Sequence, residues 1–150
     1  MFHYEHCVVT NVVDGDTFDV EFDLGFKTKT KWRCRLKGFD TPETTWRAAC
    51  PGERLFGEHA TELVTKLILH QPVSVTTHKI GIYNRYIAEI FYQDPDDPMV
   101  IHSLRETLIR EQHHKRDIDC RRCPHQNTCE IIDEVYEKLK LRWRDAPAPA

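Results

Sequence analysis

Asp16 and Asp40 are the residues of this 150-residue chain whose sequence context indicates a reactive or metal-binding site most clearly. Asp16 precedes an alternation of apolar and acidic residues over 18–24, and Asp40 follows a second alternation over 32–37. Strict alternation is the period of a half-buried strand, so we expect an antiparallel pair joined by a loop over about 25–30. Such a pair brings Asp16 and Asp40 to one end. Adjacent carboxylates repel unless a cation lies between them, and oxygen ligands favour calcium or magnesium.

Arg35 and Glu43 flank the same spot. Arg35 projects from the strand face opposite the apolar residues, so its guanidinium is able to reach a phosphate, whose oxygens match its planar fork. Glu43 lies three residues beyond Asp40, where the chain leaves the strand, within reach of a water molecule near the cation. Phosphodiester hydrolysis needs a cation, charged donors and a base for water, and these residues supply that combination.

The two motifs, in this order, resemble the staphylococcal nuclease (thermonuclease) family. The resemblance rests on Asp-Gly-Asp-Thr at 14–17, on Arg35-Leu36 and on Asp-Thr-Pro-Glu at 40–43, and it extends over about residues 8–109. Each motif alone is more often a turn, a solvated strand residue or a helix start, and only the joint match is specific. The family implies an α+β fold, namely a five-stranded OB-fold β-barrel with three α-helices. It also implies calcium-dependent hydrolysis of DNA and RNA that leaves 3′-phosphate ends.

The resemblance also assigns roles to particular residues. It implies that Glu43 is the general base and that Arg35 and Arg85 are catalytic residues that bind the phosphate. The calcium ligands that it implies are Asp16, Asp40 and the backbone carbonyl of Thr41.

The segment before Arg85 departs from the family pattern at two positions. Asn84 stands where the family usually has glycine, and because asparagine tolerates a positive φ, we expect the turn to persist. Ile82 stands where the family often has a lysine that assists a terminal phosphate, so substrate preference stays open. We expect Tyr83 to pack on a sugar or a base.

Three further residues are candidates around the site. Asp14 is expected to support the metal ligands rather than to bind the metal itself. Trp46 and Arg47 lie in a predicted loop over 44–52 that begins directly after Glu43, so we expect them to touch a base or a phosphate of the substrate. The alternative for Trp46 is that it packs the loop onto the barrel.

A segment rich in cysteine and histidine, residues 113–129, is separate from these motifs. Its thiols have a spacing that places two of them within reach of one zinc ion, so a structural zinc is one expectation. The alternatives are an iron–sulfur cluster, free thiols, or a Cys120–Cys129 disulfide in an exported protein. The candidate zinc ligands are Cys120, Cys123 and Cys129, with His125, His113 or His114 as the fourth.

Hydrophobic periodicity predicts the elements that position these residues. Runs rich in β-branched or aromatic residues predict further strands, and Cys7 is expected to be a small buried residue in the first. Apolar residues recurring at three and four predict helices. The predicted strands are 7–13, 73–78 and 85–92, and the predicted helices are 53–69, 99–112 and one from about Thr128. In the second helix, Ile101, Leu104, Leu108 and Ile109 are expected to face inward.

Length and composition bound the remaining expectations. We expect one domain over 1–144, including the 113–129 insertion, and a flexible Ala/Pro tail at 145–150. A net charge of −3 excludes a basic DNA-coating protein. No stretch is long and apolar enough to span a membrane, and the first residues do not form a signal peptide. The expected location is cytoplasmic, or secreted if a signal was removed before numbering, and the expected state is a monomer that binds nucleic acid and no membrane.

Three functions compete on these observations. The first is a metal-dependent nuclease, with calcium as cofactor. The second is a non-catalytic OB-fold module that binds nucleic acid or protein, and the third is a protein-interaction module stabilised by zinc in the cysteine segment. The carboxylates, Glu43, Arg35 and Arg85 are all present, which favours the nuclease. DNA or RNA preference, endonuclease or exonuclease mode and the physiological metal stay open.

Overall fold

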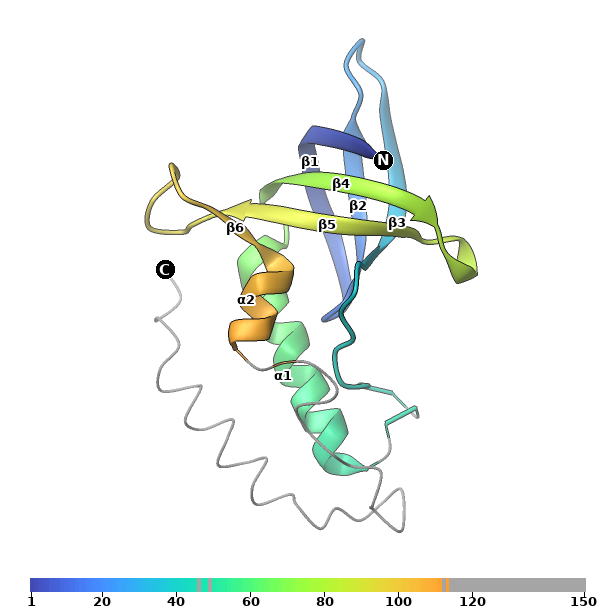
Figure 1. Cartoon of the computed structure of the whole chain (residues 1–150), viewed down its shortest axis with the longest axis vertical. Coiled ribbons are helices and arrows are strands. Elements are labelled where there is room, and N and C mark those ends of the chain that lie inside the picture. The colour runs from blue at the N-terminus through green and yellow to red at the C-terminus, as the bar shows by residue number, and fades with distance from the viewer. Residues whose placement is uncertain (46, 49, 112, 114–150) are drawn as a thin grey trace.

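Five strands of the chain close into a barrel, and two helices lie at one side of it (Figure 1). The computed structural model describes residues 1–45, 47–48, 50–111 and 113. The strand order is β3-β2-β1-β4-β5-β6, and a parallel pairing of β3 with β5 closes the barrel. This confirms the predicted α+β architecture with an OB-type barrel. The elements are β1 (Phe2–Asp14), β2 (Thr17–Asp23), β3 (Lys29–Leu36), α1 (Pro51–Ile68), β4 (Pro72–Ile80), the 3₁₀ turn η1 (Ile82–Asn84), β5 (Tyr86–Gln93), β6 (Ile101–Ser103) and α2 (Leu104–Arg110).

The antiparallel pair predicted from the two alternating runs is β2 with β3. Thr17 pairs with Arg35 at one end of the ladder, and Asp23 pairs with Lys29 at the other. The apolar residues of the alternation, such as Phe18 and Val20, are fully buried, which explains the alternating pattern. Because the chain enters β2 and leaves β3 at the same end, Asp16 lies beside the segment that follows Leu36, and the Leu36 amide donates to the Asp16 carbonyl at 2.8 Å.

The first strand is longer than the sequence pattern predicts. β1 begins at Phe2, pairs there with Thr77 of β4, and pairs with β2 from Cys7 onward. Cys7 is buried in the barrel core, as predicted. Burial raises the pKa of the Cys7 thiol to about 12, so this thiol stays protonated at neutral pH.

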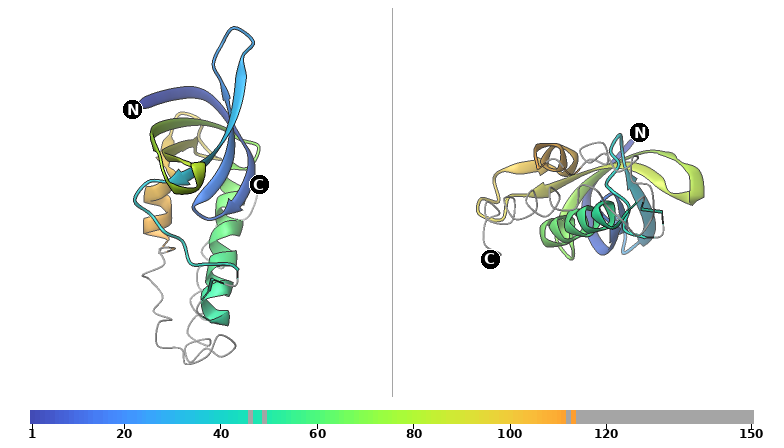
Figure 2. Two further views of the ribbon diagram at one scale, coloured as in Figure 1. Left: turned by 90° about the vertical axis from the view of Figure 1, so that its right-hand side faces the viewer. Right: turned by 90° about the horizontal axis from the view of Figure 1, so that it is seen from below.

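The C-terminal end of helix α1 lies against the strands, and the rest of the helix extends away from the barrel (Figures 1 and 2). Leu69 forms a bridge with Val9, and the His70 amide donates to the Val9 carbonyl at 2.8 Å. Val64 and Ile68 join the barrel core, as the apolar stripe predicted. The N-terminal half of the helix lies beyond the strands, and its Gly57 lies against residues 42–44 (Figure 1). In the described part of the chain, no helix combines the length and the apolar character needed to cross a membrane.

The second helix is shorter than predicted. Residues 101–103 form β6, which pairs with β5 through Gln93 and Ile101, and α2 begins only at Leu104. The prediction that Ile101 and Ile109 face inward is wrong, because both side chains are exposed. Leu104 and Leu108 are fully buried, as predicted. The helix predicted from about Thr128 lies outside the described residues, as do residues 114–150 as a whole.

Candidate active site

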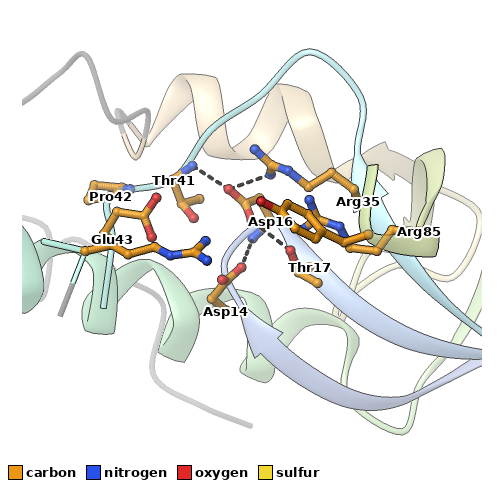
Figure 3. A pocket seen from close by; sticks show the side chains of 10 residues that line it. Asp14, Asp16, Thr17, Arg35, Thr41, Pro42, Glu43 and Arg85 are labelled. Carbon is orange, nitrogen blue, oxygen red and sulfur yellow. Dashed lines mark hydrogen bonds and ion pairs between the residues drawn. The ribbon is translucent and has the colours of Figure 1, made fainter. Parts of the chain in front are cut away.

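One pocket gathers most of the predicted site residues at the end of the barrel where β2 begins and β3 ends (Figure 3). Its volume is about 250 Å³. Both carboxylates and guanidinium groups line it, so it is suited to a ligand that carries negative charge and a cation. The lining residues are Asp14, Asp16, Thr17, Arg35, Thr41, Pro42, Glu43, Arg47, Tyr83 and Arg85.

Asp16 is the centre of the hydrogen-bond network in this pocket. It is 7 % exposed, and its Oδ2 accepts from the Thr41 backbone N–H at 2.9 Å. Its Oδ1 accepts from the Thr17 hydroxyl at 3.0 Å, and its own backbone N–H donates to Asp14 Oδ1 at 3.1 Å. The carboxylate of Asp16 is therefore held by two different segments of the chain, β2 and the segment after β3 (Figure 3).

Asp14 and Asp16 differ in their affinity for a proton. Burial, together with the hydrogen bond and negative charge of Asp16, raises the pKa of Asp14 to about 7. Burial also acts to raise the pKa of Asp16, but hydrogen bonding with Asp14, the charge of Arg35 and the Thr41 N–H outweigh it and hold that pKa below its ordinary value. Two crowded carboxylates of this kind are stabilised in the fully ionised form by a cation beside them.

Arg35 lies between the two carboxylates that the sequence predicted as metal ligands. Its Nη1 is 2.6 Å from Asp16 Oδ2, and its Nη2 pairs with Asp40 Oδ1. Nη1 also donates to the Phe39 carbonyl at 3.2 Å. Asp16 and Asp40 thus converge on one positive group. Asp40 does not line the pocket itself, and its side chain is 60 % exposed.

Gly15, between Asp14 and Asp16, packs closely against the side chain of Thr41. A Cβ built on Gly15 would lie 2.6 Å from Thr41 Cγ2, closer than real Cβ contacts. A Cβ at position 15 would therefore force the Thr41 side chain to shift. The glycine of the Asp-Gly-Asp-Thr motif is therefore explained by this close packing, and not only by the turn that it forms.

Glu43 lies on the pocket wall formed by the segment after β3, on the opposite side of Asp16 from Arg85 in the view of Figure 3. Residues 37–50 contain no helix or strand in their described part, so contacts with other segments hold Glu43 in place. Its N–H donates to Glu53 Oε1 of α1 at 3.3 Å. The position of Glu43 is thus tied to the first turn of α1.

The η1 turn and the residue after it supply two further residues of the pocket wall, Tyr83 and Arg85. Asn84 has φ 56°, which confirms the expected positive φ, and Tyr83 also has a positive φ, of 60°. The Arg85 Cζ atom lies 5.4 Å from the centre of the Tyr83 ring, so the guanidinium and the ring are in cation–π contact. Backbone strain at two consecutive residues is typical of functional sites.

Other predicted residues fall in different places. Arg47 lines the pocket, whereas Trp46 lies outside the described residues. The zinc candidates Cys120, Cys123, Cys129 and His125 also lie outside them. His113 is described: it is fully buried, stacks on Phe56, and its Nε2 is 2.8 Å from His59 Nδ1.

Sequence reasoning did not identify Thr17, Glu53 or His59. Thr17 belongs to the quoted motif, and its place directly after Asp16 was the signal that could have found it. Glu53 and His59 are on α1 and meet Glu43 and His113 only after folding. No local sequence pattern predicts contacts between residues that are so far apart in the chain.

The donor set of the pocket fits a hard cation. Among the described residues, no three His, Cys, Asp or Glu side chains are grouped closely enough to form a metal site by themselves. The expected set needs only two of these, Asp16 and Asp40, with the Thr41 carbonyl as a further oxygen donor. All three donors are oxygens, as calcium prefers, and Arg35 shows that Asp16 and Asp40 already converge on one cationic group.

Comparison with known proteins assigns the chain to a family. The model of the family described as "Staphylococcal nuclease homologue" matches residues 33–113, more than half of the chain. The matched range contains Arg35, Asp40, Glu43 and Arg85, and it begins after the 14–17 motif. No curated protein matches the chain.

Proposed function

Because the chain belongs to the staphylococcal nuclease family, we propose that it is a calcium-dependent nuclease that hydrolyses phosphodiester bonds of DNA, RNA or both. The observation that carries this proposal is the composition of the pocket beside Asp16. Carboxylates and guanidinium groups meet there from four segments of the chain. A phosphodiester beside a cation needs positive groups for its oxygens and a carboxylate for the attacking water, and this pocket presents both.

The two arginines would bind the scissile phosphate. Arg35 and Arg85 line the same pocket from β3 and from the residue after η1. Each guanidinium is a planar donor that matches two phosphate oxygens. The phosphoryl oxygens gain negative charge in the transition state, so the electrostatic stabilisation that the two arginines provide would be strongest there.

Glu43 would act as the general base. Its carboxylate lines the pocket on the side of the chain segment that also provides Thr41. A carboxylate there orients a water molecule and accepts its proton as the water attacks phosphorus. Tyr83 and Arg47, also on the pocket wall, are placed to contact the sugar, base or phosphates next to the scissile bond.

Calcium would be held by Asp16, Asp40 and the Thr41 carbonyl, with Asp14 supporting Asp16 from behind. When bound, the ion supplies Lewis-acid stabilisation of negative charge on the phosphoryl oxygens. Arg35 pairs with both Asp16 and Asp40, so a cation held by these carboxylates would share their oxygens with the guanidinium and would free some of its N–H donors for the substrate phosphate. Arg35 thus has two roles, as partner of the carboxylates and as ligand of the phosphate.

The direct test is digestion of supercoiled plasmid and of RNA by purified protein in calcium, in magnesium, and in excess chelator. We expect cleavage of both substrates in calcium, no cleavage in chelator, and products with 3′-phosphate ends. Equal cleavage in chelator would refute the metal requirement. Binding of nucleic acid without cleavage under every condition would favour a non-catalytic binding module instead.

A further inference from the structure

Glu53 is a buried carboxylate that lies outside the pocket yet contacts its wall. It is 3 % exposed and lies in the first turn of α1. Its Oε1 accepts the backbone N–H of Glu43 at 3.3 Å. Removing a carboxylate from water is costly unless the group gains hydrogen bonds in return. Its burial therefore points to a role in holding the segment that carries Glu43.

Gly57 lies one helical turn after Glu53 on the same face of α1. A Cβ built on Gly57 would lie 2.5 Å from the Pro42 carbonyl oxygen and 2.8 Å from the Glu43 carbonyl oxygen. The helix backbone therefore touches the backbone of the Glu43 segment directly, which only glycine permits. Glu53 binds the N–H of Glu43, and Gly57 receives the carbonyl side of the same residue.

The Glu43 segment needs such supports because it has no regular secondary structure of its own. On one side of Glu43, the Thr41 N–H is held by Asp16. On the other side, the Ala48 N–H donates to the Thr45 carbonyl, which is a contact within the segment and does not tie it to the fold. At Glu43 itself, α1 contacts the backbone on both sides of the residue, through Glu53 and Gly57.

We propose that Glu53 is a positioning residue for the general base: by accepting the Glu43 N–H it fixes where the Glu43 carboxylate enters the pocket. This inference rests on the proposed nuclease function. Catalysis depends steeply on such placement, and a displacement of about 1 Å by a remote change can lower a rate about 100-fold. Glu53 does not line the pocket, so the role proposed for it is exerted through Glu43.

The position of Glu53 also has a purely structural interpretation. An acidic residue in the first turn of a helix stabilises the helix N-terminus, and its loss lowers stability. That role does not depend on Glu43 and does not change the turnover of the folded enzyme. Kinetic constants of folded variants therefore separate the two roles, provided that thermal stability is measured beside them.

The test compares three variants with wild type in the calcium-dependent cleavage of a fluorescent oligonucleotide. Glu53→Gln keeps an acceptor oxygen for the Glu43 N–H, whereas Glu53→Leu removes it. Glu58→Leu is the matched control, because Glu58 is an exposed glutamate on the same helix. We expect Glu53→Leu to lower kcat by about 10- to 100-fold with KM within about twofold. Glu53→Gln is expected to keep kcat within about threefold of wild type, and Glu58→Leu to match wild type.

Each possible result either supports or overturns the positioning role of Glu53. A wild-type kcat in Glu53→Leu would overturn it, and so would an equal loss in Glu53→Leu and Glu53→Gln, because the acceptor oxygen would then not be the cause. If Glu53→Leu does not fold, Gly57→Ala takes its place: its Cβ must displace the Pro42 and Glu43 carbonyls, and an unchanged kcat would overturn the inference. An inactive wild type would refute the nuclease proposal and this inference with it, whereas an active wild type with an equally active Glu53→Leu variant would refute the inference alone.

Discussion

At the scale of single residues, Arg35 is the side chain that links the two motifs of the site. One guanidinium contacts the carboxylates of Asp16 and Asp40 and the backbone carbonyl of Phe39. These acceptors come from the start of β2 and from the segment after β3, so Arg35 holds the two motifs of the site together. Its planar fork makes these contacts at the same time, whereas a lysine ammonium would keep the positive charge as a point charge on a flexible chain.

The substitutions Arg35→Lys and Arg85→Lys are each expected to lower kcat/KM by at least about tenfold, because lysine keeps the charge but loses the fork that matches two phosphate oxygens. The melting temperature is expected to change little. The measurement is steady-state cleavage of an oligonucleotide, together with thermal unfolding of each variant.

Arg33→Lys is the matched control for this series. Arg33 lies on the same face of β3 as Arg35 and makes two hydrogen bonds to Asp19, but it does not line the pocket. It is expected to cleave at the wild-type rate. Arg35→Lys and Arg85→Lys variants as active as Arg33→Lys would show that these arginines do not bind the phosphate.

The sequence was informative about residues whose role follows from strand geometry. Alternation over 18–24 and 32–37 was enough to bring Asp16, Arg35 and Asp40 to one end of a strand pair. It could not show that Arg35 itself lies between the two carboxylates, because side-chain direction after the strand depends on the path of 37–41. It also could not show the role of Glu53, which depends on how α1 returns toward Glu43.

At the scale of elements, the boundary between β6 and α2 shows where periodicity misleads. Ile101, Leu104, Leu108 and Ile109 fit a helical stripe, but residues 101–103 are paired with β5. The Ser103 hydroxyl accepts the Glu106 backbone N–H at 3.4 Å and marks the true start of the helix. The sequence Ser-Leu-Arg-Glu at 103–106 is a capping-box pattern that could have located this boundary.

The corrected boundary makes a quantitative prediction about two neighbouring apolar residues. Leu104 is fully buried, so Leu104→Ala is expected to lower the free energy of unfolding by about 3 kcal/mol through lost packing and a cavity. Ile101 is 57 % exposed, so Ile101→Ala is expected to cost less than about 1 kcal/mol. Urea denaturation of both variants measures the difference. Equal losses would indicate that Ile101 faces a core, as a helix over 99–112 requires.

At the scale of the whole molecule, the barrel supplies a rigid end on which the site is built, and α1 supports the segment that carries Glu43. Barrel closure by β3 with β5 places the residues after η1 beside the end of β3. This is why Arg85, fifty residues from Arg35 in sequence, lines the same pocket. The family resemblance predicted that Arg85 takes part in the site, whereas hydrophobic periodicity alone could not, because a pairing between distant strands leaves no local pattern.

The cysteine segment at 113–129 carries a separate prediction. Its sequence is polar and offers few apolar anchors, so ordering it costs conformational entropy with little hydrophobic return. We propose that a structural zinc, held by Cys120, Cys123, Cys129 and a histidine such as His125, offsets this cost. Metal analysis of protein purified without chelator is expected to find about one zinc per chain.

The substitution Cys123→Ser is expected to lower the melting temperature of the protein and to leave the calcium requirement of cleavage intact. Cys7→Ser, which changes a buried thiol of the barrel core, is the control for zinc content and is expected to retain the metal. Protein that contains iron instead, or neither metal at equal stability, would contradict the zinc proposal, as would a mapped Cys120–Cys129 disulfide.

We propose above that the pocket beside Asp16 hydrolyses phosphodiester bonds with Glu43 as general base. The most direct measurement is the cleavage rate of a labelled oligonucleotide in calcium by wild type and by Glu43→Gln, which keeps the size and hydrogen-bonding capacity of the side chain but does not accept a proton. A general base contributes about 100-fold or more to a rate, so we predict a loss of at least that size with substrate affinity retained. Cleavage by Glu43→Gln at the wild-type rate would contradict the account.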